Sequence, residues 1–472
     1  MKRTGNLWDD FINIENLYAA EKKAGKGKTS KENVKNTRAD LDNKITTLQE
    51  CLLNGEYKTS KYTIYSVYEP KLRLIYTLPY YPDRIVHHAL MNLLEPIWDK
   101  LFIDTSFACR KGKGQHKGML KTCEYVRKYK YCAKLDISQF YVNLDHEVLK
   151  RILRKKLKDE RILKLLDGVI DSVASREANI NYLTKYLHRK DAKIMYDKLM
   201  VYVNEFGDRK AGVPIGNYLS QWFGNLYMNE YDMFVKHELK CKAYVRYCDD
   251  FILFSNDKKE LHEWAKKSKE FLYDNLKLVL SKSSVFPTTR GVDFLGYRMF
   301  AQGYVLLRKR TAKNIKKRFR KLDKLMRSGK VDWKKAQSVV ASTKGWIKWS
   351  NTYNFRKSIK LSELEERIDF VMRGLPKVLS SKEDYYYVAE NFDKDIWRPL
   401  WENLLFDDNI WIYVGEVEKA GEESDTVKYE ELTEDGETSI LKYEFVENPA
   451  SIYKNLGFTK EEILSKLGEE DA

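Results

Sequence analysis

The chain has 472 residues, of which 43% are hydrophobic and 33% charged, with a formal net charge of +16 at pH 7. This length predicts roughly three domains or subdomains. No apolar run approaches the ~18 residues of a membrane span, the first residues lack the apolar core of a signal peptide, and the six cysteines form no Cys-x-x-Cys pair. We therefore expect a cytoplasmic protein with free thiols and no membrane partner.

The positive charge is concentrated in the first 400 residues. From Trp401 to Ala472 there are 20 acidic and 6 basic residues, a net charge of −14, so the first 400 residues carry +30. A basic body of this size favours a polyanionic partner, and nucleic acid is the one we expect. The acidic end marks a separate C-terminal module.

The N-terminal part is predicted to be helical. Helical spacing of apolar residues predicts one helix over about residues 9–38 and another over 39–53. The first runs into a Lys- and Gly-rich stretch, residues 21–31, which we expect to be a mobile basic loop. Such a loop is either a phosphate-contacting arm or a solvated linker.

A strand pair follows, over residues 62–68 and 73–78, with Glu-Pro-Lys-Leu supplying the turn. Lys71 and Arg73 lie on or beside this hairpin, and Arg84 comes at the start of the next helix. These cations are suited to holding phosphates by charge-assisted hydrogen bonds.

The next apolar strand ends at Asp136 and is followed by the aromatic pair Phe140 and Tyr141. A carboxylate at the end of a buried strand is either a cap or a metal ligand. Residues 147–172 are predicted to be helical and basic. Residues 173–211 continue in a polar helical style, and we interpret them as an insertion between segments that carry chemistry.

A helix of about six turns opens near Val213, with an apolar stripe for burial. Gly216 precedes it and permits the close approach of a ligand or of backbone. Asn217 and Ser220 are candidates for capping this helix.

Asp249 and Asp250 are adjacent carboxylates between two apolar, β-branched runs, so residues 243–255 predict two strands joined by a tight acidic turn. Adjacent ionised carboxylates repel, and apolar flanks withhold water, so the pair is costly unless a cation binds it. Acidic sites rich in oxygen suit Mg²⁺. An ordinary acidic turn is the alternative for this pair in isolation.

Beyond the turn, a helix is predicted over residues 261–275 and a glycine-bounded aromatic strand over 291–298. Residues 308–330 hold Arg-Lys-Arg and nine further Lys or Arg against one Asp, which is typical of either a solvated face or a nucleic-acid-binding face. Within residues 414–446, acidic residues alternate with other residues, which is typical of a small β-rich module.

Taken in order, these segments resemble the reverse transcriptase family over about residues 10–350. Asp136 matches the acid of the first palm motif, and Tyr247-Cys248-Asp249-Asp250 matches the Tyr-x-Asp-Asp box of that family. Lys282 matches the lysine after the palm helix, and Gly291 to Arg298 matches the primer grip.

The resemblance implies an α+β, right-hand polymerase fold with fingers, a palm built on an antiparallel sheet, and a helical thumb. The expected divisions are an N-terminal helical extension with its basic loop (1–60), fingers and palm (61–300), a basic helical thumb (301–375) and a small acidic module, α/β or β-rich (376–472).

The resemblance also implies RNA-directed DNA polymerase activity, in which dNTPs are added to a primer 3′ end by two-metal phosphoryl transfer. Two Mg²⁺ ions, or Mn²⁺ in their place, would be bound by Asp136, Asp249 and the backbone carbonyl of Ile137. Asp250 would be the supporting carboxylate of the pair.

Seven further residues are expected to contact the substrate. Tyr141 matches the bulky gate under the sugar that rejects a 2′-hydroxyl, and Lys282 is a candidate proton donor to the leaving pyrophosphate. The set is Arg73, Lys71 and Arg84 for the triphosphate, with Tyr141, Gly216, Gln221 and Lys282.

The segment Ile215 to Gln221 departs from the Gln-Gly-x-x-x-Ser-Pro pattern of most reverse transcriptases. This variant resembles enzymes of diversity-generating retroelements and bacterial enzymes of phage defence. The insertion and the acidic module are additions that compact retroelement enzymes do not need, so we expect an anti-phage role. Error-prone copying in a diversity-generating retroelement is the alternative, and a catalytically silent nucleic-acid-binding scaffold is a further one.

The expected partners are an RNA template, a DNA primer or product, dNTPs, and a structured non-coding RNA or an accessory protein. A group II intron maturase is disfavoured, because no Cys/His-rich endonuclease segment follows the expected thumb.

Overall fold

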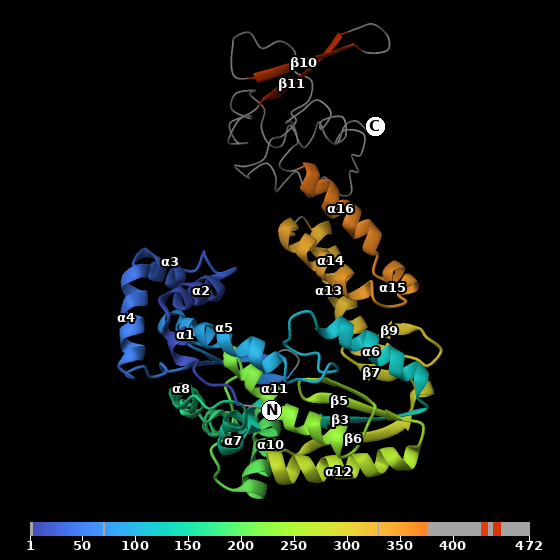
Figure 1. Ribbon diagram of the computed structural model, residues 1–472. Coiled ribbons are helices and arrows are strands. Elements are labelled where there is room, and N and C mark those ends of the chain that lie inside the picture. The colour runs from blue at the N-terminus through green and yellow to red at the C-terminus, as the bar shows by residue number, and fades with distance from the viewer. Residues whose placement is uncertain (1–2, 69–70, 329, 375–425, 433–437, 445–472) are drawn as a thin grey trace. The chain divides into compact units, whose positions relative to one another are not determined.

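The computed structural model describes residues 3–68, 71–328, 330–374, 426–432 and 438–444 (Figure 1). The chain divides into two compact units, Met1–Tyr304 and Val305–Ala472. The finer divisions predicted for the chain stay predictions. None of the described helices is long and apolar enough to cross a membrane.

Five helices of the N-terminal part pack on one another around a shared apolar core. They are α1 (Trp8–Ile12), α2 (Ile14–Gly25), α3 (Glu32–Ala39), α4 (Leu41–Leu53) and α5 (Ile85–Asp99). The single helix predicted over residues 9–38 is wrong, because Asn13 leaves the helical conformation and its side chain accepts from the Glu15 N–H, which caps α2.

The basic loop is also shorter than predicted. Residues 21–25 are helical, and Glu21 is buried, where its carboxylate accepts hydrogen bonds from Arg38 and from the Tyr80 hydroxyl. Only the residues between α2 and α3 remain as a loop.

The predicted hairpin is confirmed as β1 (Thr63–Tyr68) and β2 (Leu72–Thr77), which pair antiparallel. The central sheet has the order β4-β5-β3-β6, and every neighbouring pair is antiparallel. Its strands are β3 (Tyr131–Ile137), β4 (Ala243–Tyr247), β5 (Asp250–Ser255) and β6 (Leu280–Pro287).

One face of this sheet is apolar and faces two long helices, α11 (Tyr218–His237) and α12 (Lys258–Leu276). Figure 1 shows α12 running alongside the sheet, and it contacts β3, β5 and β6. Alternate residues of β3, such as Leu135 and Ile137, are buried on this side, while Asp136 is directed to the other face.

The helices around the sheet are α6 (Gln115–Lys128), α7 (His146–Lys156), α8 (Glu160–Asp171), α9 (Ser175–Thr184) and α10 (Lys190–Phe206). The predicted helix over residues 147–172 is two helices, because Asp159 ends the run and caps α8 by accepting from the Ile162 N–H. The predicted insertion is helical, as expected, and consists mainly of α9 and α10.

The strand predicted over residues 291–298 is wrong. This stretch is a hairpin of β7 (Val292–Phe294) and β8 (Tyr297–Met299), which pair antiparallel. Leu295 and Gly296 form the turn with positive φ angles of 50° and 85°, a conformation that glycine adopts readily.

The second unit begins with β9 (Val305–Leu307), followed by α13 (Lys309–Arg327), α14 (Trp333–Ile347), α15 (Tyr353–Ser358) and α16 (Leu361–Gly374). Ile315, Phe319, Leu322 and Met326 line one buried face of α13, so the dense Lys and Arg residues cover the rest of that helix.

Part of the predicted acidic module lies within the described residues. β10 (Thr426–Leu432) and β11 (Thr438–Glu444) form an antiparallel pair inside the stretch expected to be β-rich. The rest of residues 376–472 lies outside the described residues. The α+β class predicted for the chain is confirmed.

Candidate active site

Asp136 and Asp250 lie directly opposite each other on the paired strands β3 and β5. Side chains at directly opposite positions project from the same face of an antiparallel sheet, so the two carboxylates are neighbours. Asp250 also pairs with Tyr247 of β4, which leaves Cys248 and Asp249 as a two-residue turn. The prediction that both acids form the turn is therefore corrected: Asp250 is the first residue of β5.

Lys282 lies opposite Asp136 on the other side of β3. Asp250, Asp136 and Lys282 thus stand in one row across three strands, on one face of the sheet. The β3–β6 ladder shifts register between Asp136 and Ile137, which is a β-bulge at the end of the strand. Lys282 and the Ile137 carbonyl, the predicted backbone ligand, therefore both lie next to Asp136.

Asp249 lies in the electrostatic field of the other two acids. Burial raises the pKa of its carboxyl to about 6, and the charges of Asp250 and Asp136 add to the rise. The charge of the Arg73 guanidinium on β2 lowers the pKa of Asp249. Asp136, Asp249, Asp250 and Arg73 therefore act on one another electrostatically and belong to one site.

The donor atoms of this site fit a hard divalent cation. Over the described ranges, no three Asp, Glu, His or Cys side chains form a group that could hold a metal ion alone. Asp136 Oδ2 accepts a hydrogen bond from Ser281, and Asp250 Oδ1 lies 3.8 Å from Lys134 Nζ. Mg²⁺ keeps several waters and is commonly bound by one or two carboxylates together with substrate phosphates, so the carboxylates present suit it.

Tyr141 lies beside the turn. It belongs to a short 3₁₀ turn over Phe140–Asn143, and its hydroxyl donates to Cys248 Sγ at 3.7 Å. A Cβ atom added to Gly224 of α11 would stand 3.0 Å from the Tyr141 ring, so the ring rests against this glycine. Burial raises the pKa of Tyr141 well above its ordinary value, which keeps the phenol neutral.

Gly216 has a φ angle of 111°, and a Cβ atom there would lie 2.6 Å from the Tyr76 carbonyl oxygen. The Tyr76 N–H donates to the Ile215 carbonyl at 2.8 Å, so this loop lies against the backbone of β2. The capping prediction is wrong, because Asn217 Nδ2 donates to the Tyr62 hydroxyl and Ser220 Oγ donates to the Pro214 carbonyl.

Arg84 lies in a different group of cations. Its charge lowers the pKa of Lys28 and of His88. The His88 ring stacks on Tyr218 at a centroid distance of 4.3 Å. Burial lowers the pKa of His88 to about 4, and the neighbouring cations contribute. Lys71 and Gln221 are exposed, and within the described part of the chain neither makes a polar contact with the three carboxylates.

Arg246 is a site residue that the sequence reasoning missed. Its guanidinium is fully buried, forms a bidentate pair with Asp232 of α11, and donates to the Cys248 carbonyl at 3.1 Å. The available signal was Arg246 itself, a lone charged residue in the otherwise apolar run of residues 243–247, since such charges are rarely buried unless they are paired. Lys134 was also missed, although its position two residues before Asp136 puts it on the same face of β3.

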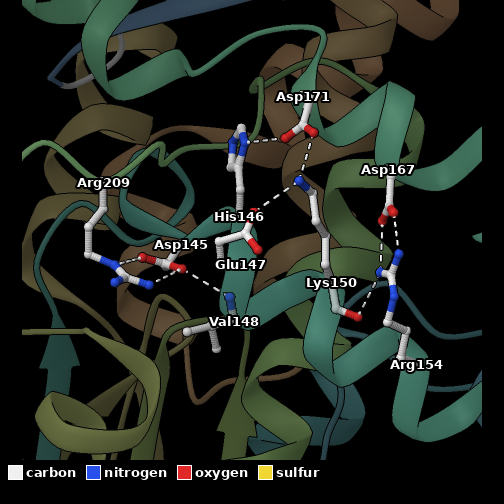
Figure 2. Close-up of polar contacts among 9 residues, drawn as sticks. All are labelled: Asp145, His146, Glu147, Val148, Lys150, Arg154, Asp167, Asp171 and Arg209. Carbon is white, nitrogen blue, oxygen red and sulfur yellow. Dashed lines mark hydrogen bonds and ion pairs between the residues drawn. The ribbon is translucent and has the colours of Figure 1, made fainter. Parts of the chain in front are cut away.

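The end of the predicted insertion is anchored to the residues just before α7, and Figure 2 shows the contact between Arg209 and Asp145. Arg209, near the end of the insertion, pairs with Asp145, which also accepts from the Val148 N–H and caps α7. His146 Nε2 donates to the Gly212 carbonyl at 3.1 Å, and His146 Nδ1 lies 3.1 Å from Asp171 Oδ1. The segment after Tyr141 therefore holds the exit of the insertion.

Much of the chain is similar in sequence to known proteins. The family model described as reverse transcriptase (RNA-dependent DNA polymerase) matches residues 61–299, just over half of the chain. Protein YkfC of Escherichia coli (strain K12) is 25% identical over 306 residues, which cover 56% of this chain and 72% of YkfC.

Group II intron-encoded protein LtrA of Lactococcus lactis subsp. cremoris is 22% identical over 355 residues, which cover 61% of this chain. The chain spans about half of LtrA, since the match covers 54% of that protein. Among solved structures, telomerase from Candida albicans with a fragment of telomeric RNA aligns at 12% identity and a TM-score of 0.34, over 75% of this chain and 64% of its own. An overlap at that score adds nothing to the family match.

Proposed function

Because the chain belongs to the reverse transcriptase family, we propose that it is a working RNA-directed DNA polymerase that adds deoxynucleotides to a primer on an RNA template. The observation that carries this proposal is the register that sets Asp136 opposite Asp250, with Asp249 in the adjoining turn. A catalytically silent nucleic-acid-binding scaffold, the opposing hypothesis, has no use for three mutually repelling carboxylates.

Asp136, Asp249 and the Ile137 carbonyl are the groups that would hold the divalent ions, with Asp250 as the supporting carboxylate. When bound, Mg²⁺ supplies neutralisation of phosphate charge and activation of the primer hydroxyl. The raised pKa of Asp249 supports this assignment, because a bound cation would favour the ionised carboxylate that burial and the two neighbouring acids disfavour.

The remaining roles concern the nucleotide. Arg73 is exposed on β2 and acts electrostatically on Asp249, so it is suited to holding a triphosphate at the same place. Lys282 is our candidate proton donor to the leaving pyrophosphate, and its register opposite Asp136 supports this role. Tyr141 would exclude a ribose 2′-hydroxyl with its ring. Lys71, Arg84, Gly216 and Gln221 stay proposals for substrate contact without a direct contact in support.

For the biological role, we propose anti-phage defence, in a complex with a structured non-coding RNA or an accessory protein. The proposal draws on residues 173–211, which we interpret as an insertion within the matched range of residues 61–299, and on the acidic C-terminal module, which lies beyond that range. Copying for a diversity-generating retroelement is the alternative. The similarity to LtrA, a group II intron-encoded protein, favours a second candidate, intron maturation.

Primer extension on an RNA template tests the polymerase proposal. The full chain is compared with Asp249→Ala/Asp250→Ala and with Asp9→Ala/Asp10→Ala, an adjacent acid pair that is exposed at the start of the chain. We expect Mg²⁺-dependent synthesis that the first double variant loses and the second keeps. Synthesis that survives the Asp249→Ala/Asp250→Ala change would refute the catalytic assignment.

The RNA that co-purifies with the chain from its native cells tests the role. A structured non-coding RNA supports defence, a template repeat supports diversification, and an intron supports maturation. Phage challenge of cells with and without the active-site acids then decides whether polymerisation is protective.

A further inference from the structure

The insertion touches the end of the strand that carries Asp136. Tyr202 of α10 is only 1% exposed, and its hydroxyl donates to the Ser138 carbonyl at 2.8 Å. The same oxygen accepts from the Val279 N–H at 3.0 Å, and Ser138 and Val279 are themselves joined, N–H to carbonyl, at 2.9 Å. One side chain of the insertion therefore joins the chain leaving β3 to the chain entering β6.

This bridge lies at the end of β3, next to the bulge, where pairing with β6 fixes the backbone less than in the regular part of the sheet. Ser138 is two residues beyond Asp136, and the β3–β6 ladder shifts between Asp136 and Ile137. A bulge leaves one residue unpaired and bends its strand, so the directions of the Asp136 side chain and the Ile137 carbonyl depend on what holds the chain just past it. The Tyr202 hydroxyl and the Ser138–Val279 hydrogen bond hold the backbone just after Ile137 in place.

The insertion is fastened on the other side of this segment as well. The Ser175 N–H donates to the Gly212 carbonyl, and the Gly212 N–H donates to the Leu144 carbonyl, so the entry and exit of the insertion meet beside the Tyr141 segment. Gln139 Nε2 also donates to the Met195 carbonyl of α10 at 3.3 Å. The residues between Asp136 and Asp145 are thus held by the insertion at both ends.

We propose that Tyr202 is a positioning residue of the active site, whose hydroxyl fixes the backbone at Asp136 and Ile137 relative to Asp249. The proposal rests on the proposed polymerase function. It gives the insertion a role in the reaction. It also assigns this role to the Tyr202 hydroxyl and not to the Tyr202 ring, which packs against Phe206 at a centroid distance of 6.0 Å.

The test uses Tyr202→Phe, which keeps the ring and removes only the bridging oxygen. Tyr227→Phe is the matched control. Tyr227 is also fully buried, its hydroxyl donates to the Leu276 carbonyl at 2.6 Å, and it accepts from the Asp145 N–H at 3.3 Å. It therefore makes the same kind of bridge between segments that carry none of the three carboxylates.

We expect both variants to lose similar thermal stability, because each leaves one buried N–H without its partner. Tyr202→Phe should lower kcat by about 10- to 100-fold, because catalysis is sensitive to displacements of about 1 Å. It should leave KM for dNTP and the affinity for primer–template, measured by fluorescence anisotropy, within about twofold. Tyr227→Phe should leave kcat within about twofold of the unsubstituted chain.

Two readouts do not need turnover. Amide hydrogen exchange should accelerate at Val279 and Ile137 in Tyr202→Phe and not in Tyr227→Phe. Added Mg²⁺ should raise the Tm of the unsubstituted chain and of Tyr227→Phe more than that of Tyr202→Phe, because at a fixed Mg²⁺ concentration a folded state that binds the ion more tightly gains more stability.

The proposal is overturned if Tyr202→Phe loses no more kcat than Tyr227→Phe and keeps its Mg²⁺-induced rise in Tm. If the unsubstituted chain makes no DNA, the polymerase proposal has failed separately, and the exchange and Tm readouts still decide the role of Tyr202. An unchanged exchange rate at Ile137 in Tyr202→Phe then rejects it.

Discussion

Arg246 and Asp232 form a fully buried, bidentate ion pair, with Nη2 and Oδ2 2.7 Å apart, and the same guanidinium donates to the Cys248 carbonyl. The pair thus links α11 to the turn that carries Asp249. Removing one partner of a buried pair leaves an uncompensated charge without water. We expect Arg246→Met to lower the free energy of unfolding by about 3–5 kcal/mol, measured by urea denaturation.

The control for this change is Arg154→Met. Arg154 pairs with Asp167 through a bidentate contact, but its side chain is 43% exposed (Figure 2). Exposed pairs contribute about 0–1 kcal/mol, so this variant should be nearly as stable as the unsubstituted chain. Equal losses in the two variants would contradict the importance assigned to burial of the Arg246 pair.

Asp249 should make the metal-free protein less stable as pH rises from about 4 to 6. Its folded-state pKa of about 6 lies above the unfolded value near 3.8, so the folded state binds more protons in that window and stability falls with rising pH. We expect Asp249→Asn to raise the free energy of unfolding at pH 7.5 in EDTA by at most about 3 kcal/mol, and by close to nothing near pH 4.

Urea unfolding at both pH values, with EDTA and with Mg²⁺, measures this effect. Bound Mg²⁺ should reduce the advantage of the variant at pH 7.5, because the cation offsets the repulsion in the unsubstituted chain. An Asp249→Asn variant that is less stable than the unsubstituted chain in EDTA at pH 7.5 would show that the carboxylate is not under electrostatic strain.

Tyr141→Val should relax discrimination against ribonucleotides. The ring rests on Gly224 and its hydroxyl lies against Cys248, so its position is set from two sides. Shortening the side chain removes the steric block, and we expect the kcat/KM ratio of dNTP to rNTP to fall at least about tenfold in single-nucleotide extension. Tyr141→Phe keeps the ring and should keep the ratio, and an unchanged ratio in Tyr141→Val would reject the gate.

Gly216→Ala should destabilise the junction between the loop before α11 and β2. The added Cβ would meet the Tyr76 carbonyl at 2.6 Å, and the φ of 111° is strained for any other residue. We expect a loss of at least about 1–3 kcal/mol in urea unfolding.

Gly168→Ala is the counterpart for Gly216→Ala. Gly168 is an exposed residue inside α8, and nothing lies within 4 Å of a Cβ placed there. Alanine should therefore stabilise the chain by about 0.5–1 kcal/mol. A stabilising Gly216→Ala would mean that the loop does not lie against β2 as described.

The parts of the site that the sequence predicts are those whose signals are local. Asp249 and Asp250 lie between two β-branched runs, and Asp136 ends a third, so period-2 alternation predicted the strands and the turn. The grouping of the three acids into one site came from the resemblance of the ordered motifs to those of reverse transcriptases. The same local signals existed for the helix break at Asn13 and for the turn at Gly296, and there the longer pattern was wrongly preferred.

The parts that escaped prediction depend on partners far apart in the chain. Arg246 and Asp232 are explicable only once α11 and β4 are packed together, and single charges in apolar runs do not name their partners. Tyr202 is one of 32 tyrosines, and its composition or spacing does not distinguish it from the others. The role of Arg84 was predicted from local order and not from its neighbours, which turn out to be Lys28 and His88.

The order of the central sheet also governs how the protein is made. β3 lies between β5 and β6, and both of these partners come later in the chain, β5 from Asp250 and β6 from Leu280. At about 5–20 residues per second, a ribosome synthesises the Asp136 strand several seconds before either neighbour exists. Strands as far apart in the sequence as β3 and its two partners pair slowly. When it is first synthesised, β3 therefore has two unpaired edges and an apolar face that is not yet covered. Until Pro287 has emerged, early packing of α11 is a contact within the chain that can cover the apolar face of β3.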